Sequence, residues 1–387
     1  MKGWLLFLVC SAAAAQTPIV REGAYWVQTI TGTIPVTVSG RLRVATEGNV
    51  ELRGGSTGAE TTYRLKKRVR AASATEAERA LREFAIRFSG PGGNVLMSIA
   101  VPKERSHGAE LSIVAPKSLR QATIETLAGN VGAFDFEGEM QARTAAGRIQ
   151  LDRLGSNASA KTGGGEIQVG RIGGGLRCFS GGGNIKAGSA GRESWFETAG
   201  GNIVIGEVGG SVHASSGGGN ISVVRSAGEV FAHTAAGVIE VQQAGGLVTA
   251  DTAGGSIQVN TAKGVRCESM AGAIRLRNVG GGALRATTGS GSILAELLSG
   301  LRIEDSMLSA TAGDVTVFFS SNTVVTVQAR NEMPGGARRI VSEFPEIRVR
   351  QAANVSSPVL AEGALNGGGP VLRIFSYGGT IYLRRQK

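Results

Sequence analysis

Apolar residues return with a fixed period of eighteen positions along the middle of the chain. In residues 201–216, Ile203 and Ile205 alternate with other residues, and Val212 and Ala214 do the same nine positions later. This alternation predicts two short strands with one buried face each, and the glycine pairs between them predict turns. Such a repeat can bury its apolar face only against stacked neighbours, as in a solenoid. The series of inward positions is Val95, Ile113, Val131, Ile149, Ile167, Ile185, Ile203, Ile221, Ile239, Ile257, Ile274 and Ile293.

The sequence therefore predicts an all-β, single-chain β-solenoid of the parallel β-helix or β-roll kind, with 18-residue coils and either two or three faces. A hydroxyl precedes nearly every inward residue by five positions. Coils stack at about 4.8 Å, so we expect these hydroxyls to satisfy one another and the turn backbone, which disfavours a catalytic serine among them. They are Thr126, Thr144, Thr162, Ser180, Thr198, Ser216, Thr234, Thr252, Ser269 and Thr288.

The N-terminus has the pattern of a signal peptide. Residues 1–15 hold a single charge and a short apolar core, and three alanines end at Ala15 before Gln16. Cleavage near Ala15 would export the protein to the periplasm, the outer surface or the medium. A lipoprotein anchor at Cys10 is the alternative, which Val9 disfavours because a small residue is expected there. No other apolar run of the sequence is long enough to span a bilayer.

Non-repetitive segments on both sides of the repeats are expected to cap the stack. The N-terminal cap is predicted over residues 16–90, with strands at 30–50 and 61–69. It also holds one helix at about 74–87, which begins at the capping box Ser73-Ala-Thr-Glu76.

The repeats occupy residues 91–313, and residues 314–387 form the predicted C-terminal cap. Strong strand patterns follow Asp314 and Thr323. The repeated phrase returns once more at Ser376-Tyr-Gly-Gly-Thr-Ile381, which predicts a last strand that closes the solenoid.

The chain has a net charge of +11, which would suit an anionic surface, but its basic residues are scattered. It has no aromatic-interleaved basic motif, which argues against nucleic acid as a partner. The densest basic run, Lys66-Lys-Arg-Val-Arg70, is interpreted as a solvated strand edge in preference to a polyanion site. Cys178 and Cys267 lie in the inward column of the second strand, five coils apart, which is too far for a disulfide. They are interpreted as small core residues.

No catalytic residue, cofactor or metal site is predicted. The Gly-Gly phrases lack the aspartate of calcium-binding β-rolls. The chain has few aspartates, and none occupy the same position in adjacent coils, as a polysaccharide-cleaving site would favour. Ser215, His233 and Asp251 share one outward column, but a flat wall without an oxyanion loop disfavours a catalytic triad.

Four aromatic side chains are the candidate contact residues. Trp195, His213 and Phe231 share the neighbouring outward column, and Phe179 is expected nearby. One interpretation is that the stacked rings only stabilise adjacent coils, at about 1 kcal/mol per pair. The other is a contact face for a glycan or a partner protein.

The strand–helix lead-in, the phrase Val114-Ala-Pro-Lys117 before Thr126-Leu-Ala-Gly-Asn-Val131, and the Gly-Gly-Asn-Ile repeats resemble a bacterial β-strand-repeat family. Its members are known as putative adhesins, and their domain has no known function. The resemblance covers most of residues 60–387. It implies a β-solenoid in the envelope or exterior of a bacterium and supplies no catalytic residues.

Three hypotheses for function follow. The first is an exported, non-enzymatic binding or scaffold protein that presents a polar strand wall to a cell-surface glycan or protein. The second is a polysaccharide-processing enzyme on the same scaffold. The third is a purely structural envelope component. The sequence does not choose an oligomeric state.

Overall fold

The computed structural model describes residues 15–386 except 38, 57–59, 92, 103–106, 298–299, 301, 333–339 and 351–356. The predicted fold class is confirmed: the chain is all-β, and coils of about 18 residues form about 11 turns of β-solenoid. The chain divides into two compact units, residues 1–183 and 184–387. In each unit the coils contribute strands to two sheets, which we call A and B. Residues 1–14 of the predicted signal peptide lie outside the described residues.

The first unit holds the helix α1 (Ala74–Arg82) and strands of both sheets. Its sheet A contains β1 (Ala15–Gln16), β2 (Val20–Glu22), β3 (Tyr25–Ile34), β5 (Asn49–Ser56), β6 (Thr61–Val69), β9 (Gly108–Pro116), β11 (Val131–Phe136), β13 (Ile149–Leu154) and β15 (Ile167–Ile172). Its sheet B contains β4 (Arg41–Thr46), β7 (Ala85–Ser89), β8 (Val95–Ala100), β10 (Gln121–Thr126), β12 (Glu139–Thr144), β14 (Ala158–Thr162) and β16 (Leu176–Ser180).

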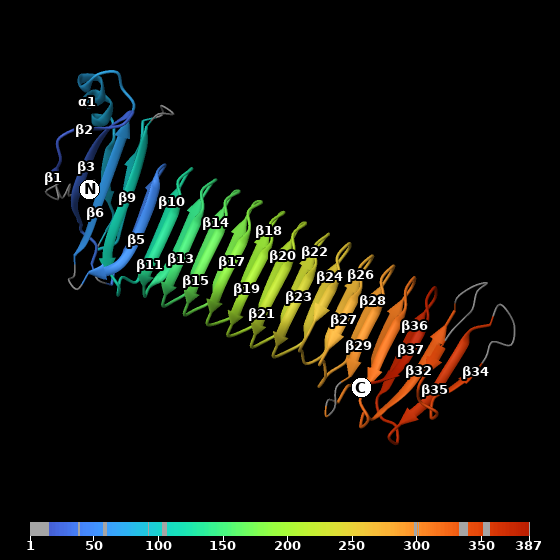
Figure 1. Ribbon diagram of the computed structural model, residues 1–387. Helices are drawn as coiled ribbons and strands as arrows, with labels where there is room; N and C mark the ends of the chain where they lie inside the picture. Colours follow the sequence, from blue (N-terminus) through green and yellow to red (C-terminus); the bar gives the residue numbers. More distant parts are fainter. Residues whose placement is uncertain are drawn as a thin grey trace, which may run out of the picture. The chain divides into compact units, whose positions relative to one another are not determined.

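The stacking order at the N-terminal end of this unit differs from the chain order (Figure 1). Residues 95–116, in β8 and β9, pair with residues 41–56, in β4 and β5. The strands β4 and β5 pair in turn with β10 and β11, which places Val131 beside Val50. Residues 41–56 are therefore a coil of the solenoid, and the prediction that they belong to a non-repetitive cap is wrong.

The same pairing corrects the predicted start of the repeat series. Ile113 lies beside Leu52, so one coil separates it from the coil of Val131. The physical reason is that β6, α1 and β7 follow β5 in the chain, so Thr46 lies beside Thr126 although eighty positions separate them in the sequence. The turn Thr46-Glu-Gly-Asn-Val50 is also one residue shorter than Thr126-Leu-Ala-Gly-Asn-Val131.

The helix begins where the capping box predicts and ends early. Ser73 Oγ accepts a hydrogen bond from the Glu76 N–H at 3.3 Å, and the Glu76 carboxylate accepts one from the Ala72 N–H at 2.9 Å. The last helical residue is Arg82, five residues before the predicted end. The chain leaves the helix because residues 85–89 pair with β8 as strand β7.

The basic run in β6 is not a solvated sheet edge, because β6 pairs with β3 on one side and β9 on the other. Lys67 points inward, is 5% exposed, and donates from Nζ to the Leu81 carbonyl at 3.1 Å. Burial lowers the pKa of Lys67, while the nearby C-terminal end of α1 favours its positive charge. The flanking cations form the ion pairs Lys66–Glu22 and Arg68–Glu110.

The second unit continues the same alternation of strands. Its sheet A contains β17 (Ile185–Ala190), β19 (Ile203–Val208), β21 (Ile221–Ser226), β23 (Ile239–Ala244), β25 (Ile257–Val259), β27 (Ile274–Arg277), β29 (Ile293–Leu297), β31 (Val315–Phe319), β33 (Ile340–Ser342) and β37 (Ile381–Arg385). Its sheet B contains β18 (Ser194–Thr198), β20 (Val212–Ser216), β22 (Val230–Thr234), β24 (Val248–Thr252), β26 (Val265–Ser269), β28 (Leu284–Thr288), β30 (Ser306–Ala310), β32 (Val325–Asn331), β34 (Arg348–Arg350), β35 (Val359–Leu365) and β36 (Val371–Ser376).

The repeated phrase near the C-terminus does not close the stack. β36 pairs in parallel with β30 and with β32, and β37 pairs with β31 and with β33. Residues 371–385 are therefore an inner coil, and the prediction of a closing strand there is wrong. Sheet B continues beyond β32 through the antiparallel strands β35 and β34.

Two ladders of polar side chains hold the turns of successive coils together. Thr234 Oγ1 donates to the Gly219 carbonyl at 2.9 Å and accepts from the Gly237 N–H at 3.3 Å. The same pattern recurs at Thr144, Thr162, Ser180, Ser216, Thr252, Ser269 and Thr288. All of these hydrogen bonds join a hydroxyl to a backbone group, whereas the sequence also predicts bonds from one hydroxyl to the next.

The second ladder is formed by asparagines. In three successive coils, the asparagine Oδ1 accepts a hydrogen bond from the backbone N–H of the equivalent residue in the next coil, at 2.8 Å. Asn184 accepts from Asn202, Asn202 from Asn220, and Asn220 from Val238. Because one side chain spans each gap between coils, the asparagines satisfy turn N–H groups that the short strands leave unpaired. Among the described residues, no helix is long and apolar enough to cross a membrane.

Candidate functional site

Trp195, His213 and Phe231 line a shallow depression of about 280 Å³ on the outer face of sheet B in the second unit. Four successive strands, β18, β20, β22 and β24, pair in parallel and in register. Residues that alternate outward along each strand therefore form straight columns across the strands. The outward side chains that line the depression are Trp195, Glu197, His213, Ser215, Phe231, His233, Thr249 and Asp251.

Trp195, His213 and Phe231 form one column, which we call the aromatic strip. The ring centroids of Trp195 and His213 are 5.2 Å apart with planes 5° apart, and those of His213 and Phe231 are 4.8 Å apart with planes 7° apart. Trp195 and Phe231 are each 36% exposed. Glu193 Oε1 lies 2.9 Å from His213 Nε2 and holds the central ring in place.

The orientation of the ring planes determines whether the aromatic strip exposes ring faces or ring edges to solvent. Because the rings are nearly parallel, each one covers a face of its neighbour, as the structural interpretation expected. His213 is covered on both faces, so the strip presents mainly ring edges. An apolar ridge of this kind suits insertion into a complementary groove better than stacking of a flat sugar ring on an open face.

Phe179 lies in the first unit and occupies a different column from the strip residues. It is the fourth residue of β16, whereas Trp195 is the second residue of β18. Its neighbour across the strands is Lys161, whose Nζ lies 5.0 Å from the ring centroid. The side chain of Phe179 is thus part of a cation–π pair.

Ser215, His233 and Asp251 pair across strands as predicted, but they do not form a catalytic triad. No hydrogen bond joins these three described side chains, whereas a triad requires a nucleophile bonded to its base. Burial, and then the neighbouring Glu268, raise the pKa of Asp251. A carboxyl that ionises less readily is a poorer stabiliser of an imidazolium.

No two aspartates share a position in adjacent coils, as the sequence indicates, but an aspartate and a glutamate do. Asp251 in β24 lies directly opposite Glu268 in β26, a neighbour that a search for aspartates alone misses. Both side chains leave the same face of one sheet, and Arg266 Nη2 lies 3.5 Å from Glu268 Oε1. Two glycosidase carboxyls must flank a sugar from opposite sides, which neighbours on a flat wall do not do.

No group of three or more His, Cys, Asp or Glu residues able to hold a metal ion occurs in the described parts of the chain. Cys178 and Cys267 are free and buried, and burial raises the pKa of both thiols.

Comparison with solved structures gives several matches, among them two bacterial proteins. No protein-family model and no curated protein matches the chain. A putative adhesin from Bacteroides fragilis shares 13% identity and covers 92% of this chain and 97% of its own, with a TM-score of 0.27. A putative cell adhesion protein from Clostridium sporogenes shares 7% identity and covers 97% and 100%, with a TM-score of 0.19. Both TM-scores lie below 0.5, so we infer function from the residues of this chain.

Proposed function

We propose that the protein is an exported, non-enzymatic binding protein of the adhesin type, which contacts a cell-surface partner through sheet B of its second unit. The aromatic strip is the observation that carries this proposal. Trp195 and Phe231 keep more than a third of their surface in water although aromatic residues make up only 5% of the chain. Large, rigid and partly exposed side chains of this kind are the usual anchors of a protein contact.

The surroundings of the aromatic strip fit a binding face. The strip runs beside a column of polar and charged side chains, Glu197, Ser215, His233 and Asp251. An apolar ridge beside a polar row offers a partner both a desolvated centre and a hydrogen-bonding rim. A partner protein with an apolar groove satisfies both features, and a glycan satisfies the polar row.

Enzymatic cleavage of a polysaccharide is the second candidate function. The observation that favours it is the Asp251–Glu268 pair, in which Asp251 has a raised pKa. The arrangement of both carboxyls on one side of a bound chain favours binding over cleavage. We therefore expect no release of reducing ends from any polysaccharide that the protein binds.

The test is a glycan array and a pull-down of envelope fractions with the predicted mature chain at low and moderate salt. The double variant Trp195→Ala/Phe231→Ala should lose binding by at least about ten-fold, as expected for two anchor residues. The control Val204→Ala/Val224→Ala removes two exposed apolar side chains, 42% and 48% exposed, from sheet A of the same unit and should bind normally. Equal binding by both variants, or binding that disappears with salt alone, would contradict the proposal.

A further inference from the structure

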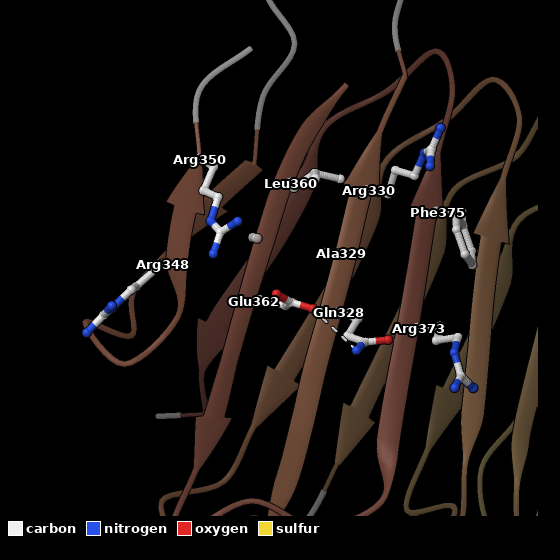
Figure 2. A pocket seen from close by; sticks show the side chains of 10 residues that line it. Gln328, Ala329, Arg330, Arg348, Arg350, Leu360, Glu362, Arg373 and Phe375 are labelled. Atoms are coloured by element: carbon white, nitrogen blue, oxygen red, sulfur yellow. Dashed lines mark hydrogen bonds between the residues drawn. The ribbon is translucent and has the colours of Figure 1, made fainter. Parts of the chain in front are cut away.

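A second depression, of about 220 Å³, lies on sheet B toward the C-terminal end of the second unit. Figure 2 shows four arginine side chains, Arg330, Arg348, Arg350 and Arg373, around the hydrogen-bonded pair of Gln328 and Glu362. These residues come from β32, β34, β35 and β36, which lie side by side in the sheet. Strands that are distant in the sequence thus bring the arginines to one face.

Two of these arginines, Arg348 and Arg373, belong to a longer row that crosses the strands. Arg285 pairs with Met307, Met307 with Arg373, Arg373 with Gln328, Gln328 with Glu362, and Glu362 with Arg348. Five strand spacings of about 4.8 Å make this row roughly 24 Å long. We call it the arginine row. It is far longer than a single phosphate or sugar, so it suits an extended chain that lies across the strands.

Most of these cations have no neutralising partner within the protein. Arg330 pairs with Glu332. Among the described residues, Arg285, Arg348, Arg350 and Arg373 form no ion pair. Arg285 also lies directly opposite Arg266, and like charges placed so are destabilising. An anionic ligand would relieve this repulsion.

The depression also contains apolar and hydrogen-bonding groups. Leu360 and Phe375 are 39% and 36% exposed between the arginines. Phe375 lies between Ser309 and Arg330 across the strands, so no second ring covers it, in contrast to the rings of the aromatic strip. Gln328 Nε2 donates to Glu362 Oε1 at 3.3 Å, and this exposed pair can also bond to hydroxyl groups.

We propose that the arginine row and the depression beside it bind an extended acidic polysaccharide that carries carboxylate groups. Guanidinium groups bind carboxylates in a planar, two-bond geometry. Phe375 and Leu360 contact the apolar faces of the sugar rings, and Gln328 and Glu362 bond to their hydroxyls. A single-stranded nucleic acid fits less well, because it requires a series of aromatic platforms for its bases, whereas the depression is lined by one aromatic ring, Phe375.

The proposal is independent of the aromatic strip, and it is tested with polygalacturonate, with neutral dextran as the uncharged polymer. Affinity is measured by isothermal calorimetry at low and moderate salt. The unchanged protein should bind polygalacturonate and not dextran. The triple variant Arg348→Gln/Arg350→Gln/Arg373→Gln should bind at least about ten-fold more weakly, because three charge-assisted contacts are lost.

A matched control distinguishes binding at the arginine row from the general attraction of a polyanion to a basic protein. Lys186→Gln/Arg225→Gln/Arg275→Gln removes three exposed positive charges from sheet A of the same unit and should leave the affinity unchanged. Phe375→Ala should weaken binding at moderate salt, where charge alone contributes little. Trp195→Ala/Phe231→Ala should have no effect, so failure of this proposal and failure of the proposed function give different results.

Three outcomes would overturn the proposal. The first is equal weakening by the two triple variants, which would indicate only long-range attraction. The second is the absence of polygalacturonate binding at low salt. The third is tighter binding of a single-stranded oligonucleotide than of polygalacturonate, which would assign the arginine row to phosphate.

Discussion

Replacing Gly219 with alanine should lower the free energy of unfolding by about 3 kcal/mol, the upper end of the usual cost of overpacking. A Cβ at Gly219 would lie less than 3.0 Å from the carbonyl oxygen of Gly201 in the preceding coil. The obstacle is backbone, which cannot rotate away, so the two turns must separate. Separation also strains the bonds of Ser216, whose Oγ donates to Gly201 and accepts from Gly219. Equilibrium unfolding in urea measures the effect.

The neighbouring Gly218 provides a matched control. A Cβ at Gly218 meets no atom within 4 Å. Gly218→Ala changes the entropy of the unfolded chain as Gly219→Ala does, so the difference between the two variants isolates the close approach of the coils. We expect Gly218→Ala to stay within about 0.5 kcal/mol of the unchanged protein. Similar unfolding midpoints for the two variants would mean that the turns do not stack as described.

Replacing Phe196 with alanine should cost about 3–5 kcal/mol, the usual cost of deleting a buried aromatic ring. Phe196 is 2% exposed and occupies an inward position that holds alanine in the next coils, as at Ala214. The opposite wall compensates: Ala187 stands where the next coil has Ile205. Residues 191–193 join β17 to β18 within this coil, so the two strands run in opposite directions, and we expect positions 187 and 196 to face each other across the core.

The double variant Phe196→Ala/Ala187→Ile gives this coil the side chains of the next one and should recover at least half of the lost stability. Ala187→Ile alone should be destabilising, because the core is then overpacked. The interaction energy of the double-mutant cycle, from thermal and urea unfolding, tests whether the two side chains share one space. Additive effects would show that they do not.

The sequence predicted the regular coils well because the neighbour of each residue there lies eighteen positions away. Register, buried positions and the columns of the aromatic strip all follow from that one number. The eighteen-residue period does not predict the stacking partners of residues 41–56 and 371–385, because those partners are far apart in the sequence. A search for the turn phrase Thr46-Glu-Gly-Asn-Val50, with its length left free, would have found the first of these coils.

The candidate sites show the same limit. The strip residues were found from the period, but the parallel ring planes depend on side-chain rotation, which the period does not determine. The arginine row could not be found, because the antiparallel strands β35 and β34 lie outside the repeat. The alternation Arg348-Val-Arg350, which places one arginine in the row and one in the depression beside it, is a local signal. The sequence shows that Phe196 is a large residue where the next coil has alanine. The small side chain of Ala187, which makes room for it, becomes apparent only when the two sheets of one coil are compared.

If sheet B of the second unit is the binding face, blocking sheet B should abolish binding, and blocking sheet A should not. A single cysteine at Thr249, beside Phe231 in the column of the aromatic strip, is coupled to a maleimide polymer. The matched control is Ser222→Cys on the outer face of sheet A. The natural Cys178 and Cys267 are buried with raised pKa values and should not react.

Binding of the coupled proteins to envelope fractions is then measured at moderate salt. We expect the polymer at position 249 to lower binding by at least about ten-fold and the polymer at position 222 to leave it unchanged. Unchanged binding with the polymer at 249, or loss of binding with the polymer at 222, would contradict the assignment of sheet B as the functional face.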